Sequence, residues 1–136
     1  MKRMRSKRWA LVGVFIGVVA ASGCGGPFLV IPGGELSGEV VTEPVDDWSF
    51  VDSAFVDLET RPEDPYSVEL NYFVVDGKLY IDPAEGREWF DHLRENPLVR
   101  VRFDGKIYPV RAVLAGEPGE IEGFDSDRFV YRLDPR

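Results

Sequence analysis

Residues 87–112 have the sequence REWFDHLRENPLVRVRFDGKIYPVRA, and this stretch decides the fold. Its first part predicts an amphipathic helix, because Trp89, Phe90 and Leu93 recur at helical spacing. An Asp-Pro pair before the helix and an Asn-Pro pair after it mark its ends, so we expect it to span about residues 83–95. One narrow helical face is therefore predicted to be buried.

The second part of this stretch predicts a β-hairpin. Two apolar-rich runs, residues 98–103 and 106–114, are joined by Asp104-Gly105, which readily supplies the positive φ angles of a type I′ turn. Counting outward from the turn predicts the facing pairs Phe103 with Lys106, Val101 with Tyr108, and Val99 with Val110.

The other face of the same hairpin collects Arg100, Arg102 and Arg111. Two interpretations are open. Guanidinium groups bind phosphate and carboxylate groups bidentately, so the three arginines are candidates for binding the anionic part of a cofactor. Alternatively, they pair with carboxylates of this acidic protein, where surface ion pairs contribute only about 0–1 kcal/mol.

Alternating and apolar runs elsewhere complete the predicted sheet. We expect one strand with a solvent-exposed face in the second half of residues 48–60, a second hairpin around Asp76-Gly77, and a last strand in residues 127–133. The second hairpin pairs residues 66–75 with 78–81. The sequence thus predicts a mainly β (α+β) domain: a six-stranded antiparallel barrel, closed or half-open, with one helix inserted between hairpins.

The N-terminal region has the features of a secretory signal. Residues 1–8 carry five basic side chains and no acid, and an apolar run of about a dozen residues follows. That run ends in Ala-Ser-Gly-Cys, which resembles the lipobox of bacterial lipoproteins. The resemblance implies that residues 1–23 are removed and that Cys24 carries the acyl chains, palmitate among them. An uncleaved helix with an incidental cysteine is the alternative.

The lipobox resemblance also predicts a cellular location and a domain organisation. Gly25 after the lipidated cysteine is similar to the outer-membrane sorting signal of two-membrane bacteria. We therefore expect a lipid-anchored, periplasm-facing protein of the cell envelope, with residues 24–45 as a Gly- and Pro-rich tether and 46–136 as the domain.

Charge excludes one class of partner. Five of the 16 basic residues and none of the 24 acidic residues lie in 1–23, so the remaining 113 residues carry 11 basic and 24 acidic side chains, near −13. Phosphate backbones repel such a protein, so nucleic acid is not expected as a partner. Cys24 is the only cysteine, which excludes internal disulfides and cysteine-based metal sites, and no other metal-ligand cluster is visible.

The pattern Trp89-x-x-x-Leu93-x-x-Asn96-Pro97, together with LETRPEDPYSVELNYFVVDGKLYI in residues 58–81, resembles the FMN-binding split barrel of the pyridoxamine 5′-phosphate oxidase-like superfamily. The nearest branch is that of the deazaflavin-dependent nitroreductases. The resemblance covers about half the mature chain, implies a split-barrel fold, and allows a homodimer. It also places Tyr66 and Tyr72 on the strand that faces the substrate in that family, although aromatic residues at strand spacing are more often core.

The basic residues that hold the cofactor phosphate in that family are absent from the matching positions of this chain. Flavin-binding members carry Lys or Arg two and four residues before the motif leucine, where this chain has Asp91 and Trp89. An aspartate at such a position repels a phosphate. FMN or a deazaflavin is therefore allowed but not favoured.

No catalytic residue is predicted. His92, the only histidine, lies one helical turn after Glu88, so a structural, charge-paired role is favoured over acid–base catalysis. The sequence thus favours a non-catalytic module that binds a small planar or anionic ligand, or a protein partner. The alternative is an FMN- or deazaflavin-dependent oxidoreductase of the nitroreductase or quinone reductase kind, with Arg100, Arg102, Arg111, Tyr66 and Tyr72 as its cofactor-binding residues.

Overall fold

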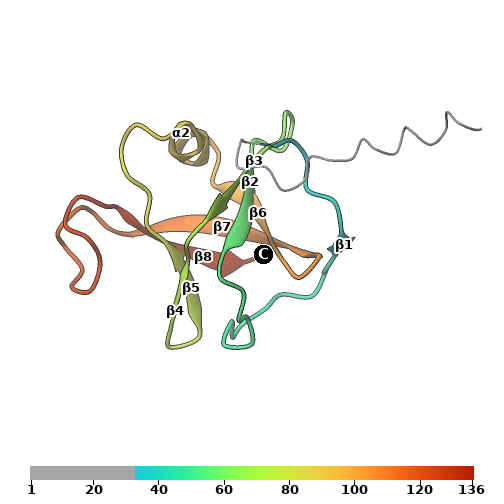
Figure 1. Ribbon diagram of the computed structural model, residues 1–136, viewed down its shortest axis with the longest axis horizontal. Coiled ribbons are helices and arrows are strands. Elements are labelled where there is room, and N and C mark those ends of the chain that lie inside the picture. The colour runs from blue at the N-terminus through green and yellow to red at the C-terminus, as the bar shows by residue number, and fades with distance from the viewer. Residues whose placement is uncertain (1–32) are drawn as a thin grey trace, which may run out of the picture.

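The computed structural model describes residues 33–136. The predicted signal segment, Cys24 and the first part of the predicted tether lie outside the described residues. Within residues 33–136, eight strands and one helix follow one another (Figure 1). They are β1 (Glu39–Val40), β2 (Val56–Thr60), β3 (Tyr66–Leu70), β4 (Phe73–Val75), β5 (Lys78–Ile81), α2 (Glu88–Glu95), β6 (Leu98–Phe103), β7 (Lys106–Gly116) and β8 (Val130–Pro135).

The hairpin of β6 and β7 confirms the register predicted from its turn. Phe103 lies opposite Lys106, and the other predicted pairs follow in step along the ladder. Asp104 and Gly105 have φ angles of 48° and 76°, and Asp76 and Gly77 between β4 and β5 have 52° and 77°. Both Asp-Gly pairs therefore form turns with two consecutive positive φ angles, as a type I′ turn requires.

Seven strands form one strongly curled antiparallel sheet, a half-barrel, in the order β3-β2-β6-β7-β8-β5-β4. β1 adds to β7 in parallel, off this path. α2 lies at one end of the curled sheet (Figure 1) and follows β5 in the chain. Its position between the two hairpins is as predicted, whereas the predicted count of six strands is wrong.

The extra strand arises because the expected strand 66–75 is divided. Its first half, β3, pairs with β2, and its second half, β4, pairs with β5. Between them Tyr72 leaves the sheet: its hydroxyl donates to the carbonyl of Ser53 at 2.6 Å and its ring packs edge-on against Phe103. The two ends of the sheet path are thus joined by Asn71 and Tyr72 rather than by strand pairing.

The helix starts five residues later than its Asp-Pro signal predicts. Gly86 has a φ of 93°, which a right-handed helix does not accommodate. The side chain of Asp82 is engaged with Arg128, so it caps no helix end. The predicted C-terminal end is confirmed, because Asn96 is extended (φ −142°, ψ 106°) and ends α2.

The predicted solvent-exposed face of β2 is confirmed only in part, because Phe55 is 49% exposed and Asp57 30% exposed. Asp57 and Glu59 point to that face, but Arg102 and Arg100 on the neighbouring strand β6 cover them. Glu59 is only 4% exposed.

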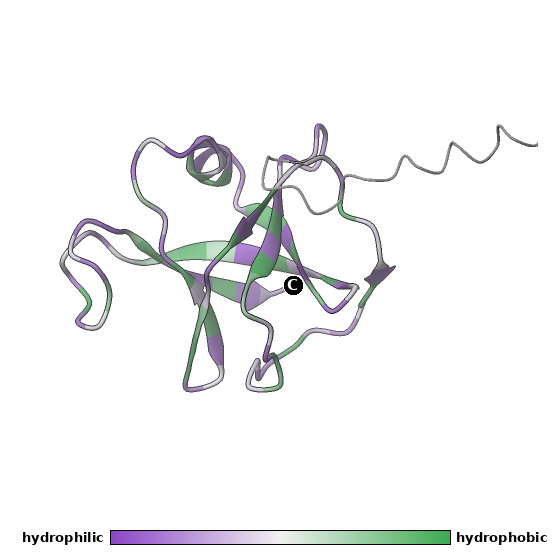
Figure 2. Ribbon diagram, viewed as in Figure 1, coloured by the Kyte–Doolittle hydropathy of each residue, from purple (hydrophilic) through white to green (hydrophobic). Residues whose placement is uncertain are grey.

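The core lies inside the curl of the sheet, where hydrophobic residues alternate with hydrophilic ones along the strands (Figure 2). Trp48 is 1% exposed and packs edge-on against Tyr108. Residues 33–45 pack on the domain as well: Leu36 is buried and β1 pairs with β7. In the described part of the chain, no helix is long and apolar enough to cross a membrane.

Candidate functional site

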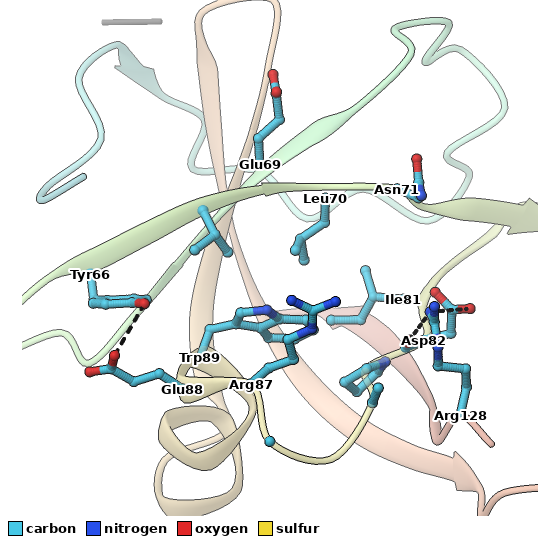
Figure 3. A pocket seen from close by; sticks show the side chains of 14 residues that line it. Tyr66, Glu69, Leu70, Asn71, Ile81, Asp82, Arg87, Glu88, Trp89 and Arg128 are labelled. Atoms are coloured by element: carbon cyan, nitrogen blue, oxygen red, sulfur yellow. Dashed lines mark hydrogen bonds and ion pairs between the residues drawn. The ribbon is translucent and has the colours of Figure 1, made fainter. Parts of the chain in front are cut away.

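A hollow with a volume of about 460 Å³ lies between β3 and the end of β5. Because the sheet path ends at β3, no strand of residues 33–136 pairs along this side of it, and the hollow lies in the gap. The segment after β5 and the start of α2 form the opposite wall (Figure 3).

Apolar side chains from three elements line part of this hollow. Val68 and Leu70 come from β3, Ile81 from the end of β5, and Trp89 from the first turn of α2. Val68 and Leu70 share one face of β3 because alternate residues of a strand point the same way. Figure 3 shows Leu70 directed into the hollow and the side chain of Glu69 directed away from it.

A chain of polar contacts fixes one end of the hollow. The Tyr66 hydroxyl donates to Glu88 Oε1 at 3.4 Å, and Glu88 Oε2 lies 3.6 Å from His92 Nε2. On its other side, His92 Nδ1 lies 3.0 Å from the hydroxyl of Thr60. Burial and the Glu88 carboxylate raise the pKa of Tyr66. The predicted pairing of His92 with Glu88 is confirmed, and this imidazole is held on both sides.

An ion pair closes the other end. Arg128 Nη1 donates to the backbone carbonyl of Asp82 at 3.0 Å and lies 3.3 Å from Asp82 Oδ2. Burial raises the pKa of Asp82 above its usual range, and the neighbouring guanidinium of Arg128 partly opposes that rise. The charges of Arg128 and Asp82 therefore form an ion pair with each other.

Arg87 is the exception in this charged lining. It is exposed, and within residues 33–136 no carboxylate forms an ion pair with it. It stands at the N-cap of α2 and its side chain caps no backbone group. Figure 3 shows its guanidinium directed into the hollow from the start of the helix. Among the described residues, Arg87 is thus a positive charge of the hollow without an ion-pair partner.

Of the residues predicted from sequence as cofactor-binding, only Tyr66 lines this hollow. Arg100 makes two hydrogen bonds with Glu59, which raise the pKa of the arginine, and Arg102 makes two with Asp57. Arg111 is exposed on β7, and Tyr72 packs into the core. The alternative interpretation, pairing with carboxylates, describes Arg100 and Arg102; cofactor binding by the five residues stays a prediction.

Sequence reasoning missed Arg87, because it lies outside the apolar face that Trp89, Phe90 and Leu93 form on the predicted helix. Its signal was present in the cap position: a helix N-cap favours Ser, Thr, Asp or Asn, and a cation there is unusual. That signal could not be used while the helix was expected to begin at Pro83.

Within the described chain, no three His, Cys, Asp or Glu residues are grouped so as to hold a metal ion. The sequence matches no described protein family and no curated protein. The split-barrel relationship therefore remains a prediction, and the site must be interpreted from its own geometry.

Proposed function

We propose that this protein is a non-catalytic binding module of a lipid-anchored envelope lipoprotein, with the hollow between β3 and α2 as its ligand site. The ligand has a planar or otherwise apolar part and an anionic group. The observation that carries this proposal is the unpaired guanidinium of Arg87 directed into a hollow that has an apolar wall.

The charge of the protein makes this guanidinium informative. The chain has a net charge of −8, and several of its other arginines, Arg94, Arg100, Arg102 and Arg132, are bound to carboxylates. A cation left without a partner in such a surplus of acid favours an anion from outside. A guanidinium recognises carboxylate and phosphate groups through two parallel hydrogen bonds.

The state of the other polar groups supports a binding role without turnover. Tyr66, Glu88 and His92 hold one another, and Asp82 is bound to Arg128. A general acid or base needs a free position within hydrogen-bond reach of its substrate, and the ring nitrogens of His92 already have neighbours on both sides.

The curled sheet with α2 between its hairpins is the arrangement expected for a split barrel descended from flavin-binding proteins. The rival function, an FMN- or deazaflavin-dependent oxidoreductase, is favoured by the same hollow, because a flavin combines a planar ring system with an anionic phosphate. FMN is for this reason one of the probes.

The test uses residues 25–136 and follows tryptophan fluorescence while FMN or naphthalene-2-carboxylate is added. Trp89 lines the hollow and Trp48 lies in the core, so Trp89→Phe assigns the signal. Arg87→Met should weaken binding of a responding probe about 10- to 100-fold, the effect of losing charged hydrogen bonds of about 1.5–3 kcal/mol. Arg111→Met, another exposed arginine away from the hollow, is the matched control and should bind normally.

Binding that depends equally on Arg87 and Arg111, or no binding of either probe below 1 mM, would contradict this site. A protein that is yellow as purified, or that oxidises NADPH in the presence of FMN, would establish the oxidoreductase instead.

A further inference from the structure

Within residues 33–136, the edge of β3 that faces away from β2 has backbone groups without partners. In an antiparallel ladder, the N–H and C=O of one residue point to the same side and those of the next residue to the other side. Ser67 uses both groups to bind Gly33, on the side away from β2. Glu69, two residues later, must therefore also direct its N–H and C=O away from β2. Among residues 33–136, nothing forms a backbone hydrogen bond with them.

This edge borders the candidate site. Glu69 and Asn71 line the same hollow as Arg87, and Leu70 between them points its side chain into it. The isolated bridge between Ser67 and Gly33, with two hydrogen bonds of 2.8 Å, shows that the edge forms backbone hydrogen bonds with an antiparallel residue.

The sequence of β3 does not protect the edge. Natural edge strands are commonly blocked by lysine, proline, a bulge or a covering segment. β3 is YSVEL, without lysine or proline, and the pairing of its five residues with β2 is regular. Among residues 33–136, the bridge at Ser67 covers only the beginning of the edge.

We propose that the ligand of this site is an extended peptide that adds as a strand to β3 at Glu69, with an acidic group bound by Arg87. Main-chain hydrogen bonds supply affinity in such strand addition, and pockets for alternate side chains supply specificity. Here an apolar side chain of the peptide lies against Leu70, Ile81 and Trp89. This inference rests on the proposed function, because it names the class of ligand for the same hollow.

The test uses residues 25–136, labelled with ¹⁵N, and a panel of acetylated five-residue peptides in which Val and Thr alternate and one position is Asp. Binding should move the amide resonance of Glu69 and slow its hydrogen exchange at least 10-fold. The same peptides N-methylated at alternate positions keep their charge and apolar surface but lose donors for the ladder, so they should bind at least 10-fold more weakly.

Glu69→Pro provides the sharpest variant. It removes the outward N–H without removing a hydrogen bond to β2, and proline is tolerated on an edge strand. Its matched control, Glu69→Ala, keeps that N–H. Peptide binding should be lost in Glu69→Pro, kept in Glu69→Ala and weakened in Arg87→Met, while unfolding in urea shows that all three variants are folded.

Equal binding of methylated and unmethylated peptides, or binding of no peptide, would overturn strand addition. If naphthalene-2-carboxylate or FMN still bound in an Arg87-dependent way, the proposed function would stand without it. Peptide binding by a chain that begins at Pro32 but not by one that begins at Gly25 would assign the edge to the chain's own residues and also overturn a peptide partner.

Discussion

At the scale of single residues, Glu59 is the one buried carboxylate of residues 33–136, with 4% of its surface exposed. It accepts hydrogen bonds from Arg100 Nε at 2.7 Å, Arg100 Nη2 at 3.0 Å and the backbone N–H of Leu36 at 2.8 Å. Arg100→Met would leave this charge buried without its partner, so we expect the free energy of unfolding to fall by about 3 kcal/mol. Equilibrium unfolding in urea measures it.

Two further variants distinguish the effect of burying the Glu59 carboxylate from the effect of an ion pair as such. Arg102→Met removes an equivalent arginine whose partner, Asp57, is 30% exposed, and should cost about 1 kcal/mol or less. Glu59→Met combined with Arg100→Met removes both charges and should recover most of the loss. Equal losses in Arg100→Met and Arg102→Met would show that burial of Glu59 is not decisive.

Asp134 should give the domain part of its acid sensitivity. Its hydrogen bonds with Arg132, 2.6 and 2.9 Å long, hold the pKa of this carboxyl below its usual value. The pair therefore stabilises the fold above the unfolded pKa of about 3.9, and this stabilisation is lost as the pH falls through the lower folded pKa. Unfolding in urea should distinguish Asp134→Asn from the wild type at pH 7 and less so at pH 3; an unchanged difference would contradict the linkage.

At the scale of secondary structure, Arg87, the proposed ligand-binding residue, occupies the N-cap position of α2. Its backbone is extended (φ −86°, ψ 131°), as an N-cap requires, but an arginine side chain can accept no hydrogen bond from the first turn. Arg87→Asp should therefore raise the free energy of unfolding by about 1 kcal/mol. The same change should abolish anion binding, and urea unfolding beside the fluorescence titration would show the opposite effects. A variant that is no more stable would remove this argument for a functional arginine.

The attachment of β1 depends on a glycine. Gly38 has a φ of 148°, and a Cβ there would clash with the backbone carbonyl oxygen of Gly105 in the β6–β7 turn. Gly38→Ala should therefore detach β1, and hydrogen exchange of the Glu39 and Val41 amides, which donate to Gly105 and Ile107, should accelerate to the rate of an open loop.

Gly105→Ala is the matched control for β1. A Cβ at Gly105 would meet no atom within 4 Å, so only the cost of its positive φ, about 1–2 kcal/mol, applies. The two β1 amides should stay protected in this variant. Loss of their protection in Gly105→Ala alone would place the constraint in the turn rather than in Gly38.

Short sequence signals correctly predicted the features that depend on only a few neighbouring residues. Both Asp-Gly turns, the β6–β7 register and the end of α2 before Pro97 follow from backbone preferences at two or three residues. The start of α2 did not, because Gly86 and the contact of Asp82 with Arg128, 46 residues away in the chain, override the Asp-Pro signal. Long-range partners of this kind are invisible to periodicity.

At the scale of the whole molecule, the candidate site was the hardest feature to predict. It lies where the sheet fails to close, between β3 and the segment after β5, and the division of the expected strand at Asn71 and Tyr72 creates that gap. Three arginines share one face of β6 and β7 and are for that reason predicted as a binding site. Two of them, Arg100 and Arg102, instead bind the carboxylates that lie directly opposite them on β2. Sequence alone did not show that Asp57 and Glu59 face them.

Attachment of the whole molecule to a membrane is proposed to depend on Cys24. Cys24 is proposed to carry the acyl chains, and each buried methylene contributes about 0.8 kcal/mol, so more than one chain gives a stable anchor. In a two-membrane bacterium, Cys24→Ala should move the protein from the membrane pellet to the soluble envelope fraction. Arg87→Met is the matched control, because it changes the ligand site and should leave the protein in the pellet. If Cys24→Ala still sediments with membranes, contacts other than the lipid hold it there, and the lipoprotein assignment is wrong.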